Sequence, residues 1–373
     1  MKALIRKLER LGVLTGWEMR PDATLSPFAV ERPWDLDVRI DQGRNRLRLT
    51  GNPSSYGRGL NIHQARLSCA MEAAERYSAF ASVFSEGIKD YTHDYMLTKR
   101  RYTELLNQEV PVLDPNEMCL EVPYRAQEIH WITAQRVDEI GYHRVYVPAQ
   151  FVFLFSNLDE PSLTSGIPST GFAAAHTLDE AKLSALLEVI ERDAEKVMPY
   201  AKNRCFLLEC DDRRISDSLE GLRRKGIQIQ FLDMTTEFGI PCYKAFVQGP
   251  GGAVLKGSAA HLDGKRAALA AMTEIPYPYP YWFGSMPPSD ELESIQYEDL
   301  PDYASGDPSA DLERVENLLL KNGYRPIYVD LTREDLGIPV VKALVPGLEM
   351  MTVFDRFTPL GLRKFAHYLE TAG

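Results

Sequence analysis

Two stretches of the sequence carry the same potentially ligand-binding residues at the same spacing. Residues 65–79 read ARLSCAMEAAERYSA and residues 181–194 read AKLSALLEVIERDA, so each contains a serine, two glutamates and an arginine within an apolar segment. At about 100° of rotation per residue, these polar side chains fall on one face of an α-helix, with an apolar stripe beside it. The repeated residues are Ser68, Glu72, Glu75 and Arg76 in the first stretch and Ser184, Glu188, Glu191 and Arg192 in the second.

If the two helical faces meet, four carboxylates and two arginines share one cavity. Neighbouring carboxylates raise each other's pKa, and a hard cation such as Mg²⁺ relieves the repulsion through oxygen ligands that it shares with substrate phosphates. Arginine binds phosphate oxygens in pairs. The pattern therefore predicts a metal and nucleotide site, although the sequence has no G-x-x-x-x-G-K-[ST] loop. The alternative is a pair of surface helices with i,i+4 ion pairs such as Glu72 with Arg76.

The residues that precede each stretch predict where its helix begins. Asn61 with Gln64, and Thr177 with Glu180, have the spacing of a capping box, which satisfies the free amides of a helix start. Glu180 also adds a further carboxylate next to the polar face of the second helix. Both repeated stretches are therefore predicted to be helices.

A third helical segment echoes the first two only in part. Residues 266–275 place Glu274 where the first helix has Glu72, and the segment breaks at Pro276. The entry loops of the first two helices, SYGRGL and PSTGFAAAH, supply glycines and small residues that let the backbone approach a ligand.

A second repeat predicts the sheets that position these helices. Residues 226–247 and 323–345 share a glycine, an apolar strand that ends in Asp, the sequence Gly-Ile-Pro, a second strand and Lys-Ala. Each unit follows a charged amphipathic segment and precedes another helical segment. Units of helix, strand, turn and strand pack as antiparallel sheet with helices on one face. The expected fold class is α+β, or mixed α/β, with repeated units that enclose the site.

Other segments have weaker patterns. The first fourteen residues are predicted to form an amphipathic helix, followed by an irregular stretch to about Asp37 and a strand at 44–51. Residues 52–60 are predicted to be a turn-rich loop. The acidic segment 287–311, which is low in large aliphatic residues, is predicted to be a mobile linker.

Composition excludes several classes of function. The 373 residues include 42 basic and 53 acidic side chains, a net charge of −11, so nucleic acid and membrane surfaces would meet net repulsion. The five cysteines are scattered, without a C-x-x-C pair, which argues against a zinc site or a disulfide framework. The amino terminus lacks the features of a signal peptide, and no apolar run is long enough to span a bilayer. A cytoplasmic protein is expected.

With these motifs in order, the sequence resembles the YcaO family. The resemblance covers nearly the whole chain from about residue 55, through GRGLNIHQARLSCAMEAAERYSA, STGFAAAHTLDEAKLSALLEVIERDA, AALAAMTEI and DLTREDLGIPVVKALVPGLE. It implies an ATP- and Mg²⁺-binding domain over residues 56–373 that forms one compact unit with residues 1–55. The implied Mg²⁺ ligands are Glu72, Glu75, Glu180, Glu188 and Glu191. The implied nucleotide contacts are Arg58, Ser68, Arg76, Ser169, Ser184, Arg192 and Glu274.

The resemblance further implies an enzyme that uses ATP to phosphorylate a peptide backbone amide oxygen after a nucleophile attacks the carbonyl carbon. Because the sequence ends in HYLETAG and not in the proline-rich terminus of azoline-forming members, thioamide formation with a TfuA-type partner is the leading hypothesis. The alternatives are an azoline-forming cyclodehydratase with a leader-peptide-binding partner, and a non-catalytic accessory factor for methylthiolation of a ribosomal protein. Tyr277 and prolines follow Glu274 where the family usually has Gln and Arg, which favours the accessory alternative. A peptide or protein substrate is expected, and a homodimer is left open.

Overall fold

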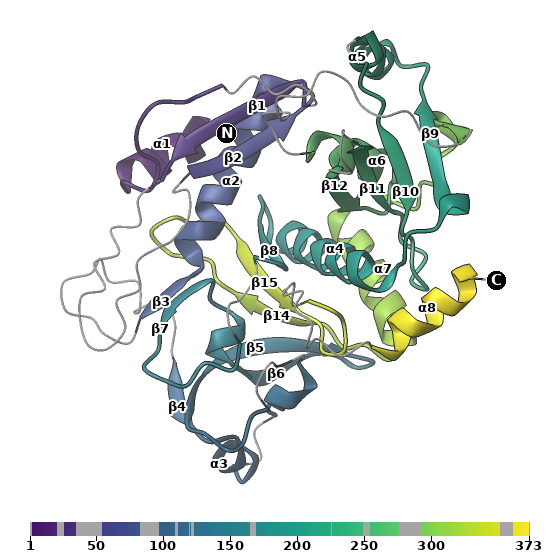
Figure 1. Cartoon of the computed structure of the whole chain (residues 1–373). Coiled ribbons are helices and arrows are strands. Elements are labelled where there is room, and N and C mark those ends of the chain that lie inside the picture. Colours follow the sequence, from purple (N-terminus) through teal and green to yellow (C-terminus); the bar gives the residue numbers. More distant parts are fainter. Residues whose placement is uncertain are drawn as a thin grey trace.

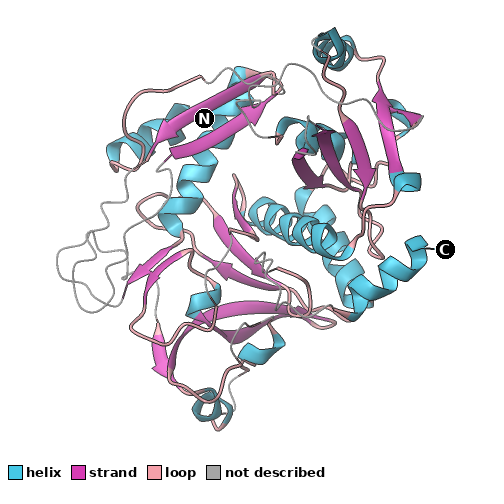
Figure 2. Cartoon of the chain, viewed as in Figure 1, coloured by secondary structure: helices cyan, strands magenta, loops and turns pink. Residues whose placement is uncertain are grey.

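Two main sheets enclose a long central helix. A computed structural model of the chain describes residues 2–20, 26–34, 54–82, 97–108, 111–118, 120, 123–164, 169–224, 226–248, 254–275, 292–350 and 361–372. Figure 1 shows the order of the elements, and Figure 2 shows how the strands gather on either side of the central helix. This helix, α4 (Leu178–Val197), packs against strands of both sheets.

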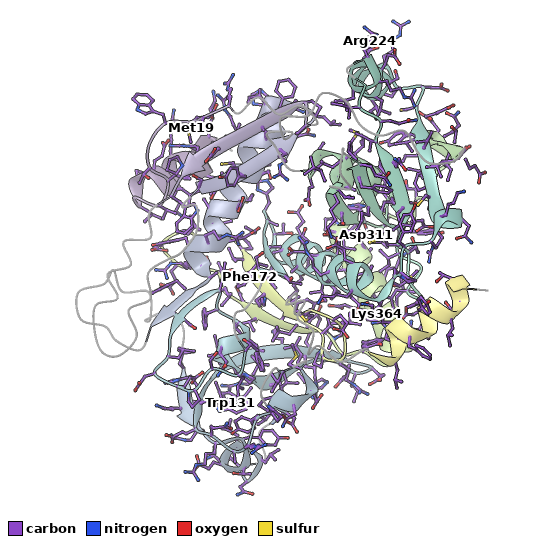
Figure 3. The ribbon with its side chains drawn as sticks, viewed as in Figure 1. Met19, Trp131, Phe172, Arg224, Asp311 and Lys364 are labelled. Carbon is purple, nitrogen blue, oxygen red and sulfur yellow. The ribbon has the colours of Figure 1, made fainter. Side chains whose placement is uncertain are left out.

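The larger sheet has six strands within the described part of the chain. Its order is β4, β5, β14, β15 and β8, with β6 paired to the other edge of β5, and all neighbours are antiparallel. The strands are β4 (Thr98–Arg100), β5 (Ile129–Asp138), β6 (Gly141–Pro148), β8 (Phe172–Ala174), β14 (Ile327–Asp330) and β15 (Val340–Leu344). Trp131 of β5, labelled in Figure 3, is fully buried in the largest apolar cluster, and its Nε1 donates to the carbonyl of Arg100 at 2.9 Å.

The second sheet has the order β12, β11, β10, β9 and β13, and only the pairing of β13 with β9 is parallel among these strands. Its strands are β9 (Cys205–Glu209), β10 (Gln230–Asp233), β11 (Cys242–Gln248), β12 (Val254–Ala260) and β13 (Glu293–Gln296). One face packs on α5 (Arg213–Arg224) and α6 (Gly264–Thr273), which share an apolar cluster with it. The other face packs on the end of α4, through Ala194 and Val197.

Shorter elements complete the fold. Strand β1 (Phe28–Pro33) pairs antiparallel with β2 (Ser54–Gly59), and β3 (Phe80–Ser82) pairs parallel with β7 (Phe155–Asn157). Helix α1 (Lys2–Arg10) packs on α2 (Ile62–Ser78) through Leu4 and Leu8. The remaining helices are α3 (Tyr102–Leu106), α7 (Pro308–Lys321) and α8 (Leu362–Ala372). The N-terminal residues thus share a core with the rest of the chain.

The strand register reveals three equivalent units, each an antiparallel strand pair that leads into a helix. The pairs are β1 with β2, β15 with β8, and β11 with β12, and the helices that follow are α2, α4 and α6. In each unit, the residue five positions before the helix cap lies directly opposite a residue of the paired strand. These facing pairs are Tyr56 with Glu31, Phe172 with Lys342, and Ser258 with Lys244.

The predicted helix starts are confirmed, with one change of detail. Asn61 Oδ1 accepts from the amides of His63 and Gln64, but Gln64 Oε1 accepts from the Leu60 amide and not from that of Asn61. Thr177 forms the reciprocal capping box with its partner three residues on. The predicted strand pairs of the Gly-Ile-Pro repeat are β10 with β11 and β14 with β15, both antiparallel.

Three local predictions were wrong. The predicted loop at 52–60 contains β2, and the predicted irregular stretch before Asp37 contains β1. The predicted linker at 287–311 contains β13, a short 3₁₀ helix and the start of α7. The strand predicted at 44–51 lies outside the described residues.

Gly57 is expected to be indispensable for the packing of α2 on β2. A Cβ atom at Gly57 would lie 1.9 Å from the Ala65 carbonyl oxygen and 2.3 Å from the Cys69 amide nitrogen. Gly57→Ala should therefore lower the free energy of unfolding by about 2 kcal/mol, because backbone must move. Gly221→Ala, inside α5 with open space around its Cβ, should instead stabilise by up to about 1 kcal/mol. Denaturant unfolding measures both, and equal effects would contradict the close approach.

Candidate functional site

The three equivalent helices each place a glutamate eleven residues after the cap. The caps are Asn61, Thr177 and Asp263, and the glutamates are Glu72, Glu188 and Glu274. All three glutamates line one cavity of about 540 Å³. The partial echo of the motif at Glu274 is therefore a structural equivalent, and three units contribute to one site.

The cavity brings together most of the residues predicted from the sequence. Its lining includes Arg58, Ser68, Glu72, Glu75, Arg76, Ser169, Glu188, Arg192 and Glu274. Phe172 also lines it and lies at the centre of the molecule in Figure 3, where β8 packs against both α2 and α4. The alternative of two unrelated surface helices is wrong, because the two polar faces meet in this cavity, but its i,i+4 ion pair of Glu72 with Arg76 is present.

Backbone amides of the entry strands orient the carboxylates. Glu72 Oε2 accepts from the Tyr56 amide at 2.8 Å, and Glu188 Oε2 accepts from the Gly171 amide at 3.0 Å. Glu75 Oε1 accepts from the amide of Ala174, on β8, at 3.0 Å. These bonds fix one oxygen of each carboxylate, so the side chains are held in place before any ligand binds.

The environment of the cavity favours protonated carboxyl groups. Burial raises the pKa of Glu75 to about 8, against the opposing effect of Arg76. Burial likewise raises the pKa of Glu188, and raises that of Glu191 well above its ordinary range. Glu274 faces the cavity, yet desolvation by the surrounding protein raises its pKa to about 7. A bound cation stabilises the ionised form of buried carboxyl groups that lie this close together.

Arginines lie among these carboxylates. Arg76 Nη2 donates to Glu72 Oε1 at 3.1 Å. Arg192 lies between three carboxylates, with N to O distances of 3.6 Å to Glu188, 3.6 Å to Glu191 and 3.5 Å to Glu195. These N to O distances are longer than those of strong hydrogen bonds. Phosphate oxygens that bind the guanidinium would therefore replace only weak contacts within the protein.

Three predicted residues do not line the cavity. Glu180 completes the capping box and accepts from the amides of His176 and Thr177 at 3.1 and 3.2 Å. Ser184 is exposed on α4. Glu191 is buried behind the lining, with only 9% of its side chain exposed. The roles of these three and of the other predicted residues as metal or nucleotide contacts stay predictions.

The donor set fits Mg²⁺ held jointly with a nucleotide. Glu191 Oε1 and Arg76 Nη1 are buried without a hydrogen-bond partner, so one acceptor and one donor remain without a hydrogen bond although both side chains are in ion pairs. Within the described residues, no three carboxylate, histidine or cysteine side chains are arranged to hold one ion. Mg²⁺ usually takes one or two carboxylates and completes its shell with water and phosphate oxygens. Of the predicted ligands, Glu72, Glu75 and Glu188 line the cavity and would be the residues to hold it.

Sequence patterns did not single out the network that holds Arg192. Glu195 Oε1 accepts from Ser258 Oγ at 2.8 Å and Lys256 Nζ at 3.0 Å, and lies 3.5 Å from Lys244 Nζ. Although burial alone would raise the pKa of Glu195, these bonds lower it to about 2. Two sequence features could have indicated this network. Glu195 lies one helical turn beyond Glu191, and Lys244 belongs to the repeated Lys-Ala.

Glu195→Gln is expected to weaken Mg-ATP binding about tenfold, because Arg192 and the two lysines lose their common anion. The free energy of unfolding should fall by about 2 kcal/mol, since the lost hydrogen bonds involve charged groups. Glu220→Gln removes an exposed ion pair with Arg224 on α5 and should change neither quantity measurably. Calorimetry and thermal unfolding test this. Binding as in the unmodified protein would show that the network is not needed.

Comparison with known proteins identifies the family. The model of the YcaO cyclodehydratase family, described as ATP- and Mg²⁺-binding, matches residues 56–276 and 280–349. The chain belongs to the YcaO family. The prediction of ATP and Mg²⁺ as cofactors is confirmed by this description of the family. No helix in the described part of this YcaO protein is both long and apolar enough to cross a lipid bilayer.

Two relatives are 28% identical to this YcaO protein over the residues that align. One is an uncharacterised protein of Methanothermobacter thermautotrophicus, matched over 336 residues, 80% of this chain and 82% of that protein. The other is an uncharacterised protein in the tfuA 3′ region of Rhizobium leguminosarum bv. trifolii, matched over 234 residues, 58% of this chain and 53% of that protein.

Solved structures confirm the predicted fold. YcaO from Methanopyrus kandleri, bound with AMPPCP and Mg²⁺, superimposes with a TM-score of 0.66 at 20% identity, over 96% of this chain and 95% of that chain. A heterocyclase in complex with substrate and cofactor gives a TM-score of 0.70 at 22% identity, over 93% of this chain. This chain spans about half the length of that heterocyclase, 52%.

Proposed function

We propose that this YcaO protein uses ATP and Mg²⁺ to activate a peptide backbone amide for conversion to a thioamide, together with a TfuA-type partner. The single observation that supports amide activation is the cavity in which glutamates and arginines of three equivalent helices meet. The relative encoded in a tfuA 3′ region supports sulfur as the incoming atom.

In this reaction, sulfide attacks the amide carbonyl carbon and the amide oxygen attacks the γ-phosphorus of ATP. The oxygen then leaves as phosphate, so that the products are a thioamide, ADP and inorganic phosphate. Arg76 and Arg192 would hold phosphate oxygens and stabilise charge on the transferred group. The glutamates would hold Mg²⁺, which neutralises the phosphates when bound. Arg58, whose Nη1 donates to the Glu274 carbonyl at 2.9 Å, braces the third unit against the first.

The decisive experiment combines the full chain, a TfuA-type partner, sulfide, Mg-ATP and peptides encoded by neighbouring genes. Mass spectrometry is expected to show sulfur-for-oxygen exchange in a peptide, with release of ADP. Omitting the partner should abolish the exchange. Peptide unchanged in all combinations, with no nucleotide bound to the protein, would overturn the proposal.

A cyclodehydratase is the second candidate, and the description of the family as YcaO cyclodehydratase favours it. In that case a Cys, Ser or Thr side chain of the peptide is the nucleophile, and the same assay records the loss of one water without sulfide. Nucleotide binding without turnover would instead support an accessory factor. The altered segment after Glu274, which motivates that third alternative, lies outside the described residues.

A further inference from the structure

Lys342 is a buried lysine directly behind the cavity, in the Gly-Ile-Pro repeat that the proposed function leaves unexplained. Lys342 is only 1% exposed, and its Nζ donates to the Thr170 carbonyl at 2.5 Å. The Nζ atom also lies 4.5 Å from the centroid of the Phe172 ring, on the neighbouring strand. Burial of a lysine is costly, so its hydrogen bond must be made in the folded state.

The loop that Lys342 contacts forms one wall of the cavity. Ser169 and Phe172 both line the cavity, and the Gly171 amide between them donates to Glu188. Gly171 is itself held by β15, because its carbonyl accepts from the Ala343 amide at 2.7 Å. The Thr170 carbonyl and the Gly171 amide belong to one peptide group, so the hydrogen bond of Lys342 acts directly on the group that orients Glu188.

The same register position anchors the entry strand in the other two units. Lys244 faces Ser258 across β11 and β12, and both side chains contact Glu195 of α4. In the first unit, Glu31 accepts from the Tyr56 hydroxyl at 3.0 Å. In each unit, the residue at this register position thus makes a polar contact with the strand or helix of the site, although the residue type differs.

We propose that Lys342 is a positioning residue of the nucleotide site. It anchors the Thr170 carbonyl and thereby holds the Gly171 amide on Glu188 and the wall formed by Ser169 and Phe172. Burial lowers the pKa of Lys342 to about 7 and Glu188 opposes this shift, but the amino group has a hydrogen to donate in either protonation state. The inference rests on the proposed function only in taking the cavity as an ATP site.

The test compares Lys342→Met, which keeps the length and loses the donor, with Lys342→Arg, which keeps a donor. Lys182→Met is the matched control, since Lys182 is also buried on α4 but contacts Gln135 and the Tyr142 ring away from the cavity. Calorimetry with Mg-ATP is expected to show about tenfold weaker binding for Lys342→Met, the value of one hydrogen bond, and recovery in Lys342→Arg. Lys182→Met should bind as the unmodified protein does, at whatever cost to thermal stability.

Hydrogen exchange supplies a readout that needs no nucleotide. The amides of Gly171, Phe172 and Ala174 are expected to exchange slowly in the unmodified nucleotide-free chain and faster in Lys342→Met. Fast exchange in the unmodified chain would overturn the inference, as would unchanged binding in Lys342→Met or equal loss in Lys182→Met. If the unmodified protein binds no Mg-ATP, the proposed function fails, and the inference fails with it. If Glu191→Gln loses binding and Lys342→Met does not, the inference fails alone.

Discussion

Glu191→Gln is expected to weaken Mg-ATP binding by at least about a hundredfold while making the nucleotide-free protein more stable. Burial raises the pKa of Glu191 well above its ordinary range; Arg192 opposes the shift, and Glu274 and Glu188 add to it. The Oε1 atom has no hydrogen-bond partner. The amide of glutamine has the same shape and no charge, so it removes the repulsion from Glu188 and Glu274. The free energy of unfolding should therefore rise by about 1 kcal/mol. It cannot supply the negative charge that a bound cation requires.

The opposite signs of these two effects distinguish a ligand-binding residue from a structural one. Glu316→Gln is the control, because Glu316 is also buried, with its pKa raised by burial, and accepts from the Tyr142 hydroxyl at 2.7 Å outside the cavity. It should leave nucleotide affinity unchanged. Calorimetry and thermal unfolding record both quantities. Unchanged Mg-ATP binding in Glu191→Gln would remove Glu191 from the predicted ligands, and equal loss in Glu316→Gln would point to a general change in the fold.

Local periodicity explains why so much of the site was predictable. The polar faces of α2 and α4 follow from side-chain spacing along a single helix, and the caps at Asn61 and Thr177 follow from residue types within one turn. Glu274 was identified for the same reason, since residues 266–275 place it where the first helix has Glu72. These are properties of short segments, so they can be predicted without knowing which elements pack against each other.

The features that were missed depend on partners distant in the sequence. Strand β2 contains Gly57 and Gly59, which indicate a turn by composition, yet the segment is a strand because it pairs with β1, and Gly57 leaves room for the close approach of α2. Strand β13 is mostly exposed and has no alternating pattern, and it exists through parallel pairing with β9. The contacts of Lys342 and Glu195 also cross between elements. The spacing of residues within one helix does not encode such contacts.

The affinity for Mg-ATP is expected to fall by about a hundredfold from pH 8 to pH 6, roughly tenfold for each unit over which a proton must be displaced. The pKa of Glu75 is raised to about 8, so this carboxyl group takes up a proton as the pH falls through this window. A cation binds the ionised carboxylates, and binding therefore releases protons. Calorimetry in buffers of different ionisation enthalpy counts the protons released.

The stability of the nucleotide-free protein should change in the opposite direction. Because the folded pKa of Glu75 lies above its ordinary value of 4.5, the folded state binds more protons than the unfolded state between about pH 5 and pH 8, and the free energy of unfolding falls as the pH rises. ATP itself takes up a proton near the acidic end of this window, so Glu75→Gln is the control that retains this contribution. The variant should show a flatter affinity profile and a smaller loss of stability at high pH. An affinity that rises on acidification, or identical profiles for the two proteins, would show that Glu75 does not titrate on binding.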